Sequence, residues 1–172
     1  MSRVKVSDVE DVRRLLGTPI GPSEWREVSQ EAVDDFSRLS GDDQWIHTDS
    51  ERARRESPFG GPVAHGNLTL AMIDGLRAEL IDWSAFELDI NYGWNKVRFP
   101  APVPVGARVR ASLELLSIDG VSVGWRILQR ITVEVEGGPR PACVAESLDI
   151  LVPRRAPEAL ALGRAPARAA AA

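Results

Sequence analysis

Two histidines, His47 and His65, are the side chains in this sequence best suited to moving protons near neutral pH. His47 follows Asp42 by five residues. On a regular strand this spacing would point the two side chains to opposite faces, but in a curved loop they can converge on one small molecule. Asp and His ordinarily titrate near pH values of about 3.9 and 6.5, so the pair would supply what moving a proton of water requires. The alternative is that Asp42 is a turn residue and His47 a partly buried structural histidine.

The second histidine directly precedes Gly66, where a long apolar segment begins. The first turn of a helix has backbone N–H groups without intrahelical partners and the positive end of the helix dipole. A glycine there lets a ligand approach the backbone closely, so we expect the Gly66 N–H to be an oxyanion-type donor. Such a donor is worth about 3–4 kcal/mol of a reaction barrier. The alternative is that Gly66 serves close packing of a helix on a sheet and that His65 is structural.

Metal chemistry is weakly indicated. His47, Asp49, Asp42 and His65 could supply ligands, but neither an HxxxH nor an HExxH spacing is present. We therefore expect no metal site. Three arginines at positions 52, 54 and 55 form a basic run that either faces solvent or meets phosphates at the rim of a pocket.

The elements that position these residues are a helix over 4–16, a short strand over 25–28, and a helix over 30–39 with Ser29 as its N-cap. Residues 40–63 have no sustained period and several prolines and glycines. A long irregular segment of this kind usually carries function in a compact domain.

The second half of the chain predicts one long helix over 63–83, with an apolar stripe and a first half that is apolar on nearly every side. Alternating apolar and polar residues then predict strands joined by hairpin turns at 119–120 and 137–138. These strands cover 86–99, 107–119, 121–136 and 140–152. The pattern predicts an α+β fold in which an antiparallel sheet packs against the long helix.

Composition limits the class of protein. The 172 residues are 44% hydrophobic and 27% charged, which suits one globular domain over 1–153. An Ala/Arg/Pro-rich flexible tail is expected over 154–172. The net charge of −4, without a basic face, argues against nucleic-acid binding. A single cysteine, no signal peptide and no stretch of about 18 apolar residues lead us to expect a cytoplasmic protein away from the membrane.

Three stretches, residues 36–47, 59–66 and 97–106, resemble the MaoC-like hydratase/dehydratase family and especially its nodulation-protein-N-like branch. The family's G-D-x-N-P-[ILV]-H loop is matched by GDDQWIH, and its A-H-G motif by the residues that end at Gly66. Gln44 and Trp45 stand where the family usually has Asn-Pro, so an amide is kept and a stiffening proline is lost. That departure leaves the acyl-chain preference open.

The resemblance implies a hot-dog fold, a sheet wrapped around a central helix, and a reaction that interconverts 2-enoyl and (R)-3-hydroxyacyl thioesters. It places the catalytic acid–base pair on Asp42 and His47, the oxyanion N–H on Gly66, and further substrate contacts on Gln44 and His65. It implies no cofactor beyond the substrate thioester, carried by coenzyme A or an acyl carrier protein. It also implies at least a homodimer.

Two other functions stay open at the sequence level. A hot-dog thioesterase would need a carboxylate on the central helix, and Asp74 and Glu79 are available. A non-catalytic acyl-thioester-binding subunit would share the fold. The chain contains Asp42, His47 and Gly66, however, and their presence together argues against a subunit that has lost its activity. A shared fold does not decide among these chemistries.

Overall fold

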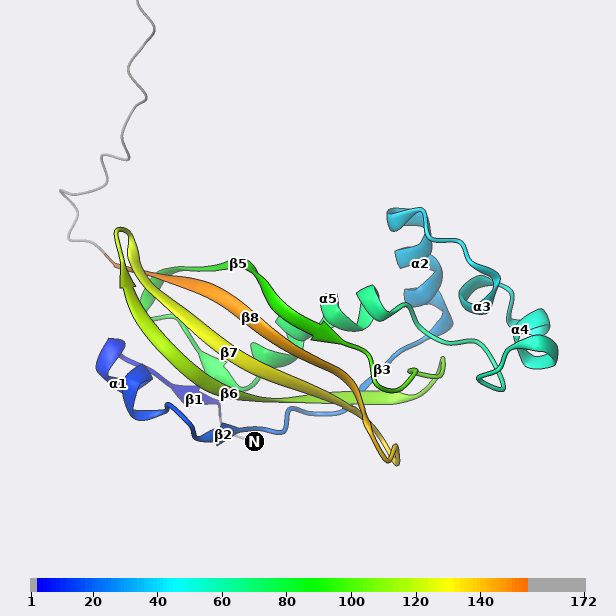
Figure 1. Ribbon diagram of the computed structural model, residues 1–172, viewed down its shortest axis with the longest axis horizontal. Coiled ribbons are helices and arrows are strands. Elements are labelled where there is room, and N and C mark those ends of the chain that lie inside the picture. The colour runs from blue at the N-terminus through cyan, green and yellow to red at the C-terminus, as the bar shows by residue number, and fades with distance from the viewer. Residues whose placement is uncertain (1–2, 155–172) are drawn as a thin grey trace, which may run out of the picture.

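In the computed structural model, which describes residues 3–154, a curved antiparallel sheet lies over a central helix, and three shorter helices extend beyond one end of the sheet (Figure 1). In order across the sheet, its strands are β2 (Pro19–Ile20), β6 (Arg108–Val121), β7 (Gly124–Val135), β8 (Pro141–Pro153) and β5 (Phe86–Arg98). The short strand β3 (Arg26–Glu27) also pairs with β6. The expected α+β hot-dog architecture is confirmed.

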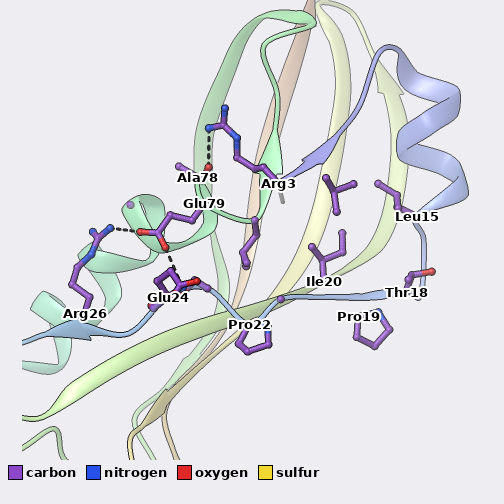
Figure 2. Close-up of a pocket in the computed structure, with 15 residues that line it drawn as sticks. Arg3, Leu15, Thr18, Pro19, Ile20, Pro22, Glu24, Arg26, Ala78 and Glu79 are labelled. Carbon is purple, nitrogen blue, oxygen red and sulfur yellow. Dashed lines mark hydrogen bonds and ion pairs between the residues drawn. The ribbon is translucent and has the colours of Figure 1, made fainter. Parts of the chain in front are cut away.

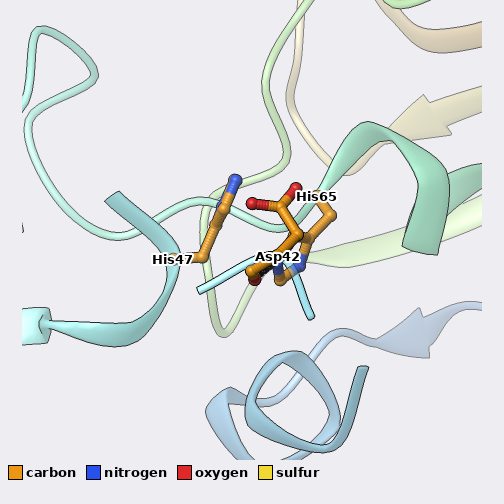
Figure 3. Close-up of side chains that lie close together, drawn as sticks. All are labelled: Asp42, His47 and His65. Carbon is orange, nitrogen blue, oxygen red and sulfur yellow. Dashed lines mark hydrogen bonds between the residues drawn. The ribbon is translucent and has the colours of Figure 1, made fainter. Parts of the chain in front are cut away.

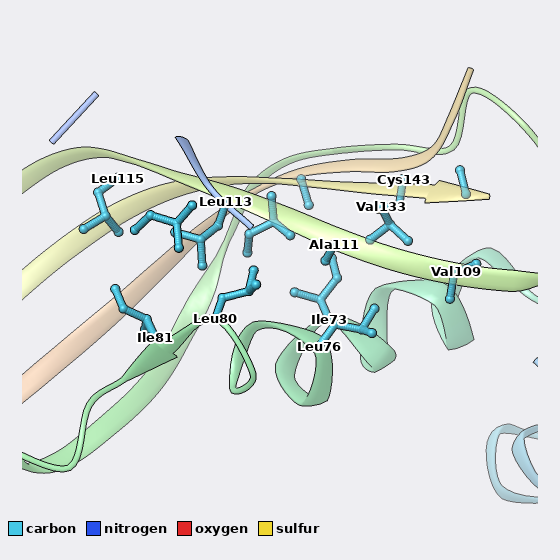
Figure 4. Packing of buried hydrophobic residues seen from close by; sticks show 14 of the residues in the cluster. Ile73, Leu76, Leu80, Ile81, Val109, Ala111, Leu113, Leu115, Val133 and Cys143 are labelled. Atoms are coloured by element: carbon cyan, nitrogen blue, oxygen red, sulfur yellow. The ribbon is translucent and has the colours of Figure 1, made fainter. Parts of the chain in front are cut away.

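The core lies between the sheet and the central helix α5 (Gly66–Arg77). Alternate residues of β6 point inward, as the sequence pattern predicts, and Ile73 and Leu76 of α5 lie opposite them (Figure 4). Burying a side chain of this size contributes about 1.5–3 kcal/mol, so this contact fixes the helix against the sheet. The inward side chains of β6 are Val109, Ala111, Leu113 and Leu115.

The central helix is shorter than the predicted 63–83 and ends at Arg77. Residues beyond it form the strand β4 (Ile81–Asp82), which pairs in parallel with β1 (Val4–Lys5). The Val4 N–H also donates to the Leu80 carbonyl at 2.8 Å. The N-terminal segment thus takes backbone groups that a longer helix would have used internally.

The first elements follow the sequence with one correction. The helix predicted over 4–16 is only α1 (Val9–Arg14), because Asp8 caps its start by accepting the N–H groups of Glu10 and Asp11. The predicted strand at 25–28 and the helix capped by Ser29 are confirmed, the latter as α2 (Gln30–Ser40).

The stretch predicted as irregular, residues 40–63, contains two short helices, α3 (Trp45–Thr48) and α4 (Ser50–Glu56). Asp49 caps the second of them by accepting the Arg52 N–H at 2.9 Å. Ala53 is the only residue of this helix that is buried, so the sequence has no apolar stripe from which the helix could be predicted.

The β6–β7 turn lies at Ser122 and Val123 rather than at the predicted 119–120. The glycine that the geometry requires is Gly124, with φ of +153°. A Cβ atom at Gly124 would come within 2.1 Å of the Leu151 carbonyl oxygen. The second turn is close to its prediction, with Gly137 at φ +69°.

At the end of β8, the Arg154 guanidinium donates to the Ser84 carbonyl. The rest of the predicted tail, residues 155–172, lies outside the described residues. Within residues 3–154, no helix is long and apolar enough to cross a membrane. Cys143 is a free thiol buried in the core.

Candidate active site

His47 lies in α3 and is fixed by backbone groups on either side. Its Nδ1 is 2.6 Å from the Val63 carbonyl oxygen. Because a carbonyl only accepts, Nδ1 carries the hydrogen and Nε2 keeps a free lone pair. The His47 carbonyl accepts from Gln30 Nε2 at 2.8 Å, and Val63 N–H donates to the Ile46 carbonyl. The imidazole is therefore held in the tautomer that can take a proton.

Asp42 follows Gly41, the left-handed residue that ends α2. The backbone carbonyl of Asp42 accepts two hydrogen bonds, from Ser37 Oγ at 2.7 Å and from His65 Nε2 at 2.9 Å. Its side chain is exposed and lies beside both imidazole rings, with the potential ligand atoms of all three residues within 4.8 Å of one another (Figure 3). The convergence that the sequence suggested is thus observed, and the catalytic roles stay a prediction.

His65 is the N-cap residue of α5 and is 2% exposed. Its ring stacks on that of His47, with centroids 3.8 Å apart and planes 29° apart, and also contacts the Phe36 ring. Three segments of the chain, the end of α2, α3 and the start of α5, therefore meet at this residue.

The same cluster could be read as a metal site, and its geometry argues against that reading. A histidine binds an ion through a lone pair in the plane of its ring. One nitrogen of each ring is already engaged, since His47 Nδ1 bonds the Val63 carbonyl and His65 Nε2 bonds the Asp42 carbonyl. The expectation of no metal stays a prediction.

Electrostatics favour the uncharged form of His47. Burial lowers the pKa of His47 below its ordinary value of 6.5, and the neighbouring His65 lowers it further. The hydrogen bond to Val63 and the Asp42 carboxylate act in the opposite direction but do not cancel the effect of burial. Near neutral pH the Nε2 lone pair is therefore available as a base.

A cavity of about 380 Å³ opens next to this pair and is lined by both His47 and Gly66. Asp42, Gln44 and His65 are not among its lining residues. Gly66 is the first residue of α5, so its N–H has no intrahelical acceptor. The ring of Phe99 lies over this glycine so closely that a Cβ would come within 2.9 Å of it. The apolar wall includes Ile46, Phe59, Val63, Phe99, Pro102 and Val103.

A second cavity, of about 700 Å³, lies between the N-terminal segment and the end of α5, away from the histidines (Figure 2). Glu79, one of the two carboxylates that a thioesterase could use, lines it and pairs with Arg26. The other, Asp74, pairs with Arg77 at 3.2 Å. Each of these carboxylates is thus paired with an arginine, and neither is part of the Asp42, His47 and His65 cluster.

Comparison with known proteins decides the family. The model of the MaoC like domain matches residues 11–136. The chain belongs to the MaoC-like domain family. The 3-hydroxyacyl-thioester dehydratase Z of Mycobacterium tuberculosis is 47% identical over 141 residues, which are 81% of this chain and 93% of that protein. Nodulation protein N of Rhizobium leguminosarum is 36% identical over 82% of this chain and 89% of its own length.

The same MaoC-like fold appears in solved structures. The (R)-hydratase from A. caviae involved in PHA biosynthesis superposes with a TM-score of 0.65 and 23% identity, over 79% of this chain and 96% of that one. This likeness confirms the fold expected from the sequence motifs.

Several residues that shape this MaoC-like site were not anticipated. Val63 orients His47 through its carbonyl, and Ser37 and Gln30 hold backbone groups of the Asp42 and His47 segments. Backbone contacts of this kind leave no signal in a single sequence. The basic run was expected either to face solvent or to reach a pocket rim, and it does not line this cavity. Arg52 instead lies over the Trp45 ring at 4.3 Å and pairs with Glu56.

Proposed function

We propose that this chain is a hydratase/dehydratase that interconverts 2-enoyl and (R)-3-hydroxyacyl thioesters of coenzyme A. The observation that carries the proposal is one arrangement: a carboxylate and a buried imidazole with a free lone pair stand beside an apolar cavity whose wall includes Gly66, the first residue of the central helix. The family membership and the dehydratase relative at 47% identity support it.

In the hydration direction, a water molecule is held by the Asp42 carboxylate and His47 Nε2 above the C2–C3 double bond. The Gly66 N–H donates to the thioester carbonyl oxygen and stabilises the enolate character that develops there. The water oxygen bonds to C3 while its proton passes to the pair, and the pair returns a proton to C2. Dehydration runs the same steps backwards. Hydration adds water without a redox change, so we expect no cofactor beyond the thioester.

The cavity supports an acyl thioester as the ligand. Its walls are largely apolar, as a fatty acyl chain requires, and the charged or titratable side chains on them are His47 and Arg140. Gln44 directly precedes α3, and we assign its amide to a contact with the bound substrate at the edge of the site. Small-molecule sites commonly combine such apolar walls with a few polar groups.

Hydration of a short enoyl-CoA, followed as loss of the enoyl absorbance, tests the proposal. Asp42→Asn and His47→Gln should each lower kcat by at least about 100-fold, the usual size of an acid–base contribution. Asp43→Asn, the adjacent carboxylate, serves as the matched control and should stay close to the parent protein. Full activity in both site variants would refute the assignment. Binding of enoyl-CoA without turnover by the parent protein would support a non-catalytic subunit instead.

We also propose that the chain forms a homodimer through β5. This strand runs for 13 residues at the edge of the sheet, and within residues 3–154 it pairs with β8 alone. A long edge strand offers unpaired N–H and C=O groups to another chain. It also exposes three large apolar side chains: Leu88, Ile90 and Tyr92. Such a row is what a strand-to-strand contact between two copies would cover.

A further inference from the structure

His65 combines two properties that the other residues of the cluster do not share. It is buried, as His47 is, but unlike His47 it does not line the cavity. Its ring contacts both members of the proposed pair and also Phe36: Nε2 reaches the Asp42 carbonyl at 2.9 Å, and the ring stacks on the His47 imidazole. Its other nitrogen, Nδ1, is buried without a hydrogen-bond partner. The orientation of the ring therefore depends on one hydrogen bond and on stacking.

The Asp42 carbonyl is a suitable point from which to control the Asp42 carboxylate. Asp42 lies in the loop just after the end of α2, and its side chain is exposed. Two donors, Ser37 Oγ from α2 and His65 Nε2 from the start of α5, fix that carbonyl from different elements. Because the carbonyl and the side chain belong to the same residue, fixing one restricts where the other can lie.

We propose that His65 is a positioning residue, which holds the Asp42 carboxylate beside the His47 imidazole through its Nε2–H and its stacked ring and does not touch the substrate. The proposal rests on the proposed hydratase function for its kinetic consequences. It assigns the histidine before Gly66 a role that differs from substrate binding: it locks the loop, the short helix α3 and the central helix into one geometry.

Two substitutions separate the hydrogen bond from simple filling of space. His65→Phe keeps a flat ring against His47 and removes the donor. His65→Gln removes the ring but places an amide N–H at about the distance from Cα that Nε2 occupies. With enoyl-CoA as substrate, we expect His65→Phe to lower kcat by about 10- to 100-fold with little change in KM, since a misplacement of about 1 Å can cost that much. His65→Gln should recover most of this loss.

A structural role alone would give a different result. Both variants would then lose thermal stability while their folded fraction kept the parent kcat. Ile131→Val, in the core strand β7, is the control for lost packing and should leave kcat unchanged. If His65→Phe or His65→Gln does not fold, Ser37→Ala removes the other donor to the same carbonyl and should lower kcat in the same direction. Unchanged kcat in Ser37→Ala and His65→Phe would overturn the proposal, as would equal losses in the Phe and Gln variants.

A second measurement needs no substrate, so it separates failure of this proposal from failure of the proposed function. The chain has two histidines, so either His65 variant leaves one imidazole, His47, to follow by NMR titration. The Asp42 carboxylate raises the pKa of His47. Burial also shifts this pKa, so the effect of the carboxylate is read by adding Asp42→Asn to each variant. We expect Asp42→Asn to lower the His47 pKa less in His65→Phe, where the carboxylate is released, than in His65→Gln. Equal decreases in the two backgrounds would overturn the positioning role whether or not the protein hydrates enoyl-CoA.

Discussion

Whether His47 can act as a base depends on which of its ring nitrogens carries the hydrogen. The Val63 carbonyl fixes it on Nδ1, so Nε2 is the atom that we propose takes a proton from water during hydration. Protonated His47 cannot do this, and burial lowers the pKa of His47 below 6.5. We expect kcat/KM for hydration to be constant near neutral pH and to fall only on the acid side, with a midpoint below about 6.5. A pH profile with enoyl-CoA measures this, and a midpoint above the ordinary histidine value would contradict it.

Gly66 offers a second test at the same scale. Its φ lies outside the left-handed region, so alanine suits the helix, but the new Cβ would come within 2.9 Å of the Phe99 ring beside the cavity. We expect Gly66→Ala to lower kcat/KM by about 10-fold or more, because crowding shifts the thioester away from the N–H donor. Thermal stability should change little. Adding Phe99→Leu should restore part of the activity, and failure to do so would show that the ring is not the obstacle.

Sequence reasoning anticipated that Asp42 and His47 converge, and it missed the groups that hold them. The spacing of Asp42 and His47 and the glycine at a helix start allowed chemistry but also allowed a turn residue, a structural histidine and close packing, and the resemblance to the MaoC-like motifs favoured the first interpretation. That Val63 and Ser37 hold them could not be foreseen, because any residue supplies a carbonyl and many loops contain serine. Such contacts depend on which segments meet in space.

At the scale of elements, a buried ionic cluster ties the end of α5 to the sheet. Arg77 contacts Asp89 of β5 at 3.1 Å and Asp149 of β8 at 3.0 Å. Asp149 also accepts from Gln129 and Ser147. Burial raises the pKa of Asp149 and raises that of Asp89 to about 6, although Arg77 opposes both shifts. Nothing in the helical stripe predicted this cluster, since an arginine near a helix end is usually exposed.

The cluster makes stability depend on pH. A carboxyl whose folded pKa exceeds its unfolded value of 3.8 binds a proton more tightly when folded. Its contribution to folding is fully present below about pH 3.8 and is lost as pH rises from there through about 6. Relative to Asp89→Asn, the parent protein should therefore lose up to about 3 kcal/mol of unfolding free energy between acid and neutral pH. Urea unfolding of both proteins at several pH values measures this, and parallel pH curves would contradict it.

For the molecule as a whole, the long strands were predictable and the pairing of the ends was not. Alternation in β6 and β7 reflects one buried face, a property of each strand by itself. The pairing of Val4–Lys5 with Ile81–Asp82 joins segments far apart in the sequence, and two-residue strands carry no period. Residues 4–5 and 81–82, which the sequence placed in helices, form strands in this contact, and the Asp8 cap sets where the N-terminal helix begins.

The proposed dimer is tested at this largest scale by placing a charge on β5. Ile90 is 40% exposed on the edge strand, whereas Val123, at 44%, lies at the tip of the β6–β7 turn. A lysine at a buried strand-to-strand contact leaves an unpaired charge out of water, which is strongly unfavourable. Ile90→Lys should therefore shift the mass in sedimentation or light scattering from dimer to monomer, while Val123→Lys stays dimeric. A dimer in both variants would place the contact elsewhere, and a monomeric parent protein would remove β5 as an interface. The two exposures are nearly equal, so a difference between the variants reports where the partner sits rather than the loss of an exposed apolar side chain.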